Sequence, residues 1–338
     1  MAPGRRPGAT GEDERLGKAT SDSFILMIEG QEGISYDGLL QLARKVEALG
    51  FGGLFRSDHW LPISGARTLD ATDAWATLAG LARETQRIRL GALVSPMTFR
   101  HPTEFAKIVA TVDQMSGGRI DAGFGAGWYD GEHQTYGLPF YTLKERFDRM
   151  EEAIKVCTSL WSESDSSSFE GTYYQLENAP GFPKPAQKPL PVIIGGKGAK
   201  RTPALTAQFA REYNTGGLLH EWVERCDRVR AACETIGRDP ASVRYTWMTA
   251  TCIGLTEADA WKRAERRFTH SQQTGDVKAW VEDQVSRGMT FGSVEQVAEK
   301  LRAYAEAGAD RFYLQIVPAP EDEHVELIAR EVMPLVTA

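Results

Sequence analysis

Short apolar runs that resemble strands alternate with amphipathic helical patterns along nearly the whole chain of 338 residues. The first run is Phe24–Ile28, and in the helical segment Tyr36–Leu49 apolar residues recur at helical spacing. Near-continuous apolar strands that alternate with helices are typical of a parallel sheet covered on both faces. Eight such units predict an α/β protein, closed as a TIM-like (β/α)8 barrel rather than left as an open doubly wound sheet.

The remaining elements follow from the same patterns. Further strands are expected at 53–57, 88–94, 119–124, 191–194, 212–215, 245–253 and 312–317, and helices at 71–85, 102–115, 143–162 and 323–336. Segment 163–190 breaks the alternation with Ser, Gly and Pro, and Thr172–Leu176 suggests a short hairpin inside it. We therefore expect a tail at 1–21 that is disordered and one barrel domain at 22–338 with an insertion at 163–190.

Composition excludes several classes of protein. A hydrophobic content of 42% and a charged content of 25% are those of a soluble globular chain. The net charge of −7 argues against a nucleic-acid partner. No apolar run reaches the roughly 20 residues of a membrane span, and residues 1–21 lack the apolar core of a secretory signal, so we expect a cytoplasmic protein. Four scattered cysteines without a CxxC pair predict neither a disulfide framework nor a metal site.

The chemistry is predicted to lie where strands end. The fourth strand leads into Gly123–His133, in which alternating glycines precede two aromatic residues, carboxylates and a histidine. Glycine leaves room for a flat group to approach the backbone, and α/β enzymes place their sites beyond the carboxyl ends of strands. This segment therefore predicts a cofactor-binding enzyme.

Two further strand ends carry candidate site residues. Asp58-His59 follows the second strand, and a histidine there can exchange a proton beside a redox ring. Gly195–Arg201 is a glycine-rich turn with three cations before a helix, which is typical of a phosphate site. It is neither a Walker A loop nor a dinucleotide fingerprint, and a plain strand-to-helix turn with solvated lysines is the alternative.

The other polar residues are expected to have structural roles. His101 precedes a proline at a helix start, and His133 has no second ligand at metal spacing. Surface positions are predicted for His220, His270 and His324, and pairing within the helix or at an interface for Arg146, Asp148 and Glu151.

These residues resemble the luciferase-like monooxygenase superfamily, and within it the branch of oxidoreductases that use the deazaflavin coenzyme F420. The matching stretches are GFGGLFRSDH, which ends at His59, and the segments 87–102, 116–140, 146–153, 191–202 and 291–317. The resemblance implies a TIM-like barrel with an insertion after the fourth helix. It also implies a non-proline cis peptide at Leu93–Val94 that braces one face of the redox ring.

The resemblance also assigns roles to residues. His59, Asp58 and Glu132 are the implied catalytic residues, and no metal is implied. The implied cofactor-binding residues are Asp58, His59, Leu93, Val94, Ser95, Gly125, Ala126, Gly127, Tyr129, Gly195, Gly196, Lys197 and Gly198. Two positions depart from the family: Trp128 stands where sugar-phosphate dehydrogenases have a catalytic glutamate, and Arg211 stands where an aspartate is usual.

Three functions remain open at this point. The first is hydride transfer between coenzyme F420 and a small organic substrate. The second is a two-component monooxygenase that receives reduced FMN from a partner, and the third is a barrel that binds a flavin-like ligand without turnover. The residues of segments 125–133 and 292–317 resemble the F420-dependent branch more closely, which favours the first function. The resemblance further implies a homodimer and a separate reductase that regenerates the reduced cofactor.

Overall fold

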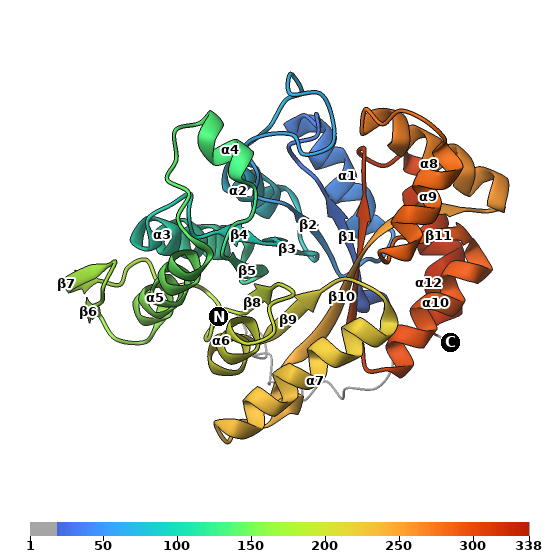
Figure 1. Ribbon diagram of the computed structural model, residues 1–338. Helices are drawn as coiled ribbons and strands as arrows, with labels where there is room; N and C mark the ends of the chain where they lie inside the picture. The colour runs from blue at the N-terminus through green and yellow to red at the C-terminus, as the bar shows by residue number, and fades with distance from the viewer. Residues whose placement is uncertain (1–18, 338) are drawn as a thin grey trace, which may run out of the picture.

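The computed structural model describes residues 19–337 as a closed barrel of eight parallel strands surrounded by helices (Figure 1). The barrel strands are β1 (Phe24–Ile28), β2 (Gly53–Arg56), β3 (Arg89–Ala92), β5 (Ile120–Gly125), β8 (Val192–Gly195), β9 (Glu212–Thr215), β10 (Arg244–Gly254) and β12 (Arg311–Ile316). The predicted fold and all eight predicted strands are confirmed. Most of the predicted tail 1–21 lies outside the described residues, and Ser21–Ser23 forms a short 3-10 turn.

The first and last strands close the barrel. Leu26 of β1 lies opposite Leu54 of β2 on one side and Leu314 of β12 on the other. Figure 1 shows this closure as the blue β1 beside the orange and red strands. Two short strands were not predicted: β4 (Ser95–Pro96) pairs with the end of β5, and β11 (Thr290–Ser293) pairs in parallel with the carboxyl end of β10.

Helices cover the outside of the barrel. They are α1 (Tyr36–Ala48), α2 (Ala74–Glu84), α3 (Pro102–Ser116), α4 (Asp130–Thr135), α5 (Leu143–Trp161), α6 (Arg201–Phe209), α7 (Leu219–Thr235), α8 (Glu257–His270), α9 (Val277–Ser286), α10 (Val294–Glu306), α11 (Asp322–Leu327) and α12 (Met333–Thr337). Several begin at a capping side chain: Ser35, Asp73 and Thr142 each accept a hydrogen bond from a backbone N–H of the first turn. The Asp73 cap explains why α2 begins three residues later than its apolar pattern predicts. No helix among residues 19–337 is long and apolar enough to cross a membrane.

The insertion carries the predicted hairpin. Strands β6 (Ser166–Glu170) and β7 (Gln175–Pro180) pair antiparallel. Glu152 of α5 accepts hydrogen bonds from the backbone N–H groups of residues 172, 173 and 174 at 2.8, 2.8 and 3.1 Å, and thereby anchors the turn to the barrel's outer layer.

The barrel interior has an apolar middle layer. Ile25, Phe55, Ile193 and Tyr313 are fully or almost fully buried there, and the rings of Phe55 and Tyr313 meet edge to face at 5.2 Å. The partly buried Val94 packs on this layer from the loop after β3. The four cysteines are all buried and unpaired, as expected for core residues.

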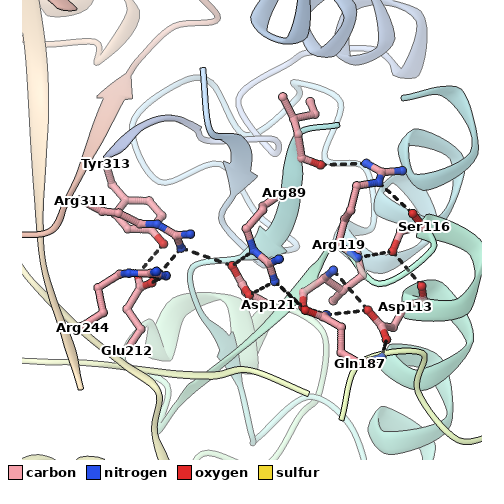
Figure 2. Close-up of polar contacts among 12 residues, drawn as sticks. Arg89, Asp113, Ser116, Arg119, Asp121, Gln187, Glu212, Arg244, Arg311 and Tyr313 are labelled. Carbon is pink, nitrogen blue, oxygen red and sulfur yellow. Dashed lines mark hydrogen bonds and ion pairs between the residues drawn. The ribbon is translucent and has the colours of Figure 1, made fainter. Parts of the chain in front are cut away.

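Charged side chains fill the amino end of the barrel (Figure 2). Arg311 lies between two buried carboxylates, with its Nη1 2.9 Å from Glu212 and 3.5 Å from Asp121. Arg89 forms a second ion pair with Asp121, and the Tyr313 hydroxyl donates to Glu212 at 2.5 Å. Burial and the Glu212 charge together raise the pKa of Tyr313 well above its ordinary value. Because each charge has a partner, this layer can be buried.

The departure at position 211 leaves this layer intact. Arg211 is exposed at the entry to β9, so it does not compete for a place inside the barrel. The buried carboxylate of this strand comes from the next residue, Glu212, which also accepts a hydrogen bond from Thr246 at 3.2 Å.

We predict that Glu212→Ala lowers the free energy of unfolding by about 3–5 kcal/mol, because it leaves the buried Arg311 guanidinium without its nearer carboxylate. Urea denaturation followed by circular dichroism measures the change. The matched control is Glu84→Ala, which breaks the exposed Arg44–Glu84 pair and should cost no more than about 1 kcal/mol. Equal losses in the two variants would show that the amino-end network does not stabilise the barrel.

Candidate active site

His59 and Glu132 form an ion pair at the carboxyl end of the barrel. His59 follows β2, and Glu132 lies in the first turn of α4, after β5. The His59 Nδ1 is 2.8 Å from one Glu132 oxygen, and the other oxygen accepts the Trp60 backbone N–H at 3.1 Å. The Glu132 side chain is only 1% exposed. The fold thus brings together two of the three predicted catalytic residues, which are 73 positions apart in sequence.

The surroundings of His59 favour its protonated form. Burial by itself would lower the pKa of His59, but the hydrogen bond and charge of Glu132 outweigh it and raise the pKa above the ordinary value of 6.5. Because Nδ1 is held by Glu132, Nε2 is the nitrogen left for exchange, and no residue in 19–337 forms a hydrogen bond with it. His59 can therefore give or take a proton at Nε2.

Aromatic rings surround this pair. The His59 ring meets the rings of Trp128 and Tyr129 at centroid distances of 5.7 and 6.2 Å. Trp60 stacks on Phe99 at 4.6 Å and meets Tyr136 edge to face at 5.8 Å. Rings from the loops after β2, β4 and β5 thus form one wall of the barrel mouth.

Asp58, the third predicted catalytic residue, is engaged by other groups. It is fully buried, and Arg100 donates to its two oxygens at 2.6 and 3.2 Å. The Ser95 hydroxyl also donates to Asp58 at 2.7 Å and accepts the Trp75 indole N–H at 2.9 Å. This arrangement favours a positioning role for Asp58 over proton transfer, because its charge is already paired. The side chain of Ser95, a predicted cofactor contact, is likewise occupied by protein partners.

The loop after β3 carries the expected cis peptide. The Leu93–Val94 bond is cis and non-proline. A Cβ placed on Gly125 would lie 2.5 Å from Val94, and one on Gly195 would lie 3.2 Å from it. The glycines of β5 and β8 therefore make room for Val94, which stands at the barrel mouth. For Gly125, the space that a side chain would need is filled by Val94, and its part in cofactor binding stays a prediction.

The glycine-rich turn after β8 presents donors to solvent. Lys197 and Gly198 are exposed, and no residue among 19–337 accepts a hydrogen bond from their backbone N–H groups. Gly196 adopts φ +148° and donates to the Asn214 carbonyl at 3.1 Å, which fixes the turn on β9. Arg201 is not available, because it pairs with Asp148 at 2.5 Å and Glu151 at 3.0 Å. Lys197 and Lys200, both exposed, remain as cations for an anion, and Lys197 lies next to the unengaged N–H groups.

Arg146 supports the predicted segment Gly125–Tyr129 in a way that the sequence did not reveal. Its Nη1 donates to the Gly127 carbonyl at 2.5 Å, and its guanidinium lies 4.0 Å above the Phe140 ring. Gly127 has φ +76°, a conformation that favours glycine. The prediction of ion pairs is thus confirmed for Asp148 and Glu151 but wrong for Arg146.

Most of the other histidines have structural partners. His133 is fully buried between the Tyr129 carbonyl, at 2.8 Å, and the Thr98 hydroxyl, at 2.7 Å. His220 is exposed as predicted, and His101 caps α3. The surface prediction is wrong for His324, whose burial lowers its pKa to about 3.

The surface prediction is also wrong for His270. Its Nε2 lies 2.9 Å from Glu32, whose carboxylate also accepts three backbone N–H groups of residues 63–65 at 2.7–2.8 Å. Glu32 therefore ties the end of α8 to the loops after β1 and β2. Sequence patterns gave no signal for it, because its partners are backbone groups 31 to 33 positions away and a histidine 238 positions away.

The luciferase-like monooxygenase family matches residues 23–311. The chain belongs to this family. A protein named F420-dependent glucose-6-phosphate dehydrogenase from Microbacterium testaceum is 30% identical over 87% of this chain and 83% of its own length. One of the same name from Nakamurella multipartita is 36% identical over 89% and 92%. A protein named FMNH2-dependent dimethylsulfone monooxygenase from Pseudomonas fluorescens is 27% identical over 90% and 87%.

Solved structures share the fold of this luciferase-like protein. An F420-dependent secondary alcohol dehydrogenase, solved with an F420-acetone adduct, superposes with a TM-score of 0.80 at 20% identity, over 96% of this chain and all of that one. A coenzyme F420-dependent tetrahydromethanopterin reductase from Methanopyrus kandleri superposes with a TM-score of 0.77 at 18% identity, over 93% and 99%.

We predict that Glu132→Gln lowers the pKa of His59, because the charge that raises it is lost while burial, which lowers it, remains. NMR titration of the His59 ring protons measures both pKa values, and Glu84→Gln should leave the titration unchanged. The sign for stability follows: a raised pKa in the folded protein stabilises it below pH 6.5, and this contribution is lost as the pH rises through the raised value. Superimposable curves for wild type and Glu132→Gln would contradict the assigned pair.

Proposed function

We propose that this protein is a coenzyme F420-dependent oxidoreductase that transfers a hydride between the deazaflavin and a small organic substrate. The observation that carries the proposal is the buried His59–Glu132 pair, which holds a proton-exchanging Nε2 at the mouth of the barrel. The names of the relatives support the same cofactor.

The residues present fit such a cofactor. Val94, which packs partly buried on the apolar barrel interior, offers a flat ring system an apolar support. The Lys197–Gly198 turn offers unengaged backbone N–H groups and a free ammonium to a phosphate. When bound, a deazaflavin supplies a ring carbon that gives or takes a hydride.

The chain's own contribution is proton transfer. In the reducing direction, the substrate carbonyl carbon gains the hydride, the carbonyl π pair moves to oxygen, and His59 donates the Nε2 proton to that oxygen to give an alcohol. His59 is then reprotonated from water. In the oxidising direction, His59 takes the hydroxyl proton as the carbon loses its hydride. Glu132 stabilises the imidazolium in both directions.

The same geometry bears on the two alternative functions, an FMN-dependent monooxygenase and a non-catalytic flavin-binding barrel. Reduced FMN would fit the same support and turn, and the dimethylsulfone monooxygenase relative favours it as the second candidate. A non-catalytic barrel would have no use for a buried carboxylate that raises the pKa of a histidine at the mouth. We also propose that the protein forms a homodimer and that a separate reductase regenerates its reduced cofactor.

Trp128 argues against glucose 6-phosphate as the substrate despite the names of the relatives. By the family resemblance, sugar-phosphate dehydrogenases have a catalytic glutamate at this position, and an indole can neither donate nor accept a proton in its place.

Fluorescence titration of the purified protein with F420 and with FMN tests the cofactor. We expect tight binding of F420, weaker binding of FMN, and no oxygen uptake during turnover, because a reduced deazaflavin passes hydride and reacts poorly with oxygen. An oxygen electrode makes the second measurement. Tighter binding of FMN together with substrate-dependent oxygen uptake would establish the monooxygenase instead.

Lys197→Ala should weaken F420 binding by about 1–3 kcal/mol, the range for loss of a charge-assisted hydrogen bond. Affinity for a deazaflavin without its phosphate should stay the same, which localises the loss to the phosphate. Lys262→Ala, which removes an exposed lysine on α8, is the matched control. Equal losses for the two ligands would remove Lys197 from the phosphate site.

A further inference from the structure

Trp128 exposes its indole at the barrel mouth. All eight tryptophans of the chain lie in the described residues, and Trp128 alone among them is exposed, with 62% of its surface accessible. Trp75, Trp222 and Trp247 are at most 2% exposed. A single exposed apolar residue is common on a protein surface, but an exposed aromatic ring beside a candidate site can bind a ligand by apolar contact.

The indole is held in place by its neighbours. It stacks on Tyr129, with centroids 5.3 Å apart and ring planes inclined by 22°, so one of its broad faces is covered. Its contact with the His59 ring is edge to face, with an angle of 79° between the planes. The exposed indole therefore lies beside the histidine that can exchange a proton.

The ring contacts of the indole are aromatic. None of the lysines and arginines in 19–337 lies over the Trp128 ring. His59, which contacts the indole, is already paired with Glu132, and the preceding Asp58 is paired with Arg100. The Trp60, Phe99 and Tyr136 rings extend the aromatic wall on the other side of the His59–Trp60 segment.

We propose that the Trp128 indole is the substrate-binding platform and that the substrate is a flat, uncharged carbonyl compound or the alcohol derived from it. The ring of this compound stacks on the open indole face, and its oxygen faces Nε2 of His59. The proposal rests on the proposed function and names the class of substrate for that site. It makes Trp128 a residue that determines specificity through apolar contact.

Equilibrium binding of 1-indanone, a flat aromatic ketone, tests the platform in both the cofactor-free and the F420-loaded protein. We expect Trp128→Ala to weaken binding about 10-fold or more, the loss expected for one stacked ring, and Trp128→Phe to stay within about 3-fold of wild type. Phe182→Ala is the matched control, since Phe182 is 52% exposed on the insertion and should bind nothing. Calorimetry gives the constants, and circular dichroism confirms folding.

Two outcomes would overturn the platform: equal 1-indanone affinity in wild type and Trp128→Ala, including no binding by either, or tighter binding of glucose 6-phosphate than of 1-indanone by the wild type. Failure of the cofactor proposal is distinguishable from both. If F420 does not bind while Trp128→Ala still weakens 1-indanone binding to the cofactor-free protein, the platform stands and the proposed cofactor is wrong.

Discussion

Closure of the barrel is the constraint on which the rest of the molecule depends. Once β1 pairs with both β2 and β12, every strand has two neighbours and all carboxyl ends meet at one rim. The interior must then be filled. Apolar side chains fill the middle, and the paired charges of Arg89, Asp121, Glu212 and Arg311 fill the amino end. The carboxyl end is left for loops, which is where His59 and Glu132 meet.

At both ends of the barrel, buried charges are stabilised by ion pairs, but the two ends differ in whether every polar atom has a partner. At the amino end each buried charge has a partner inside the protein, so the network is closed and stabilises the fold. At the carboxyl end Glu132 satisfies only Nδ1 of His59 and the Trp60 amide. The open Nε2 is the difference, and it turns an ion pair into a site that can move a proton.

The sequence predicted the barrel because each strand is a local pattern. Strand β9 is a good example: residues 212–215 are weakly apolar, yet the repeat of the other units placed it correctly. The family resemblance added the cis peptide at Leu93–Val94 and named the residues of the site. The sequence predicted neither β11 nor the roles of Glu32 and Arg146. Strand β11 is a short strand that pairs with the carboxyl end of β10, and the partners of Glu32 and Arg146 are mostly backbone groups that no side-chain pattern marks.

By itself, the sequence determined the order of strands and helices, the family, and the residue types at each strand end, because these depend on local periodicity and composition. Tertiary structure alone decided which of those residues act together. It paired His59 with Glu132 and Asp58 with Arg100. It also placed Val94 in the space beside Gly125 and left the Trp128 indole exposed beside His59. Pairing and exposure depend on distances between loops from different strands, which only the closed barrel sets.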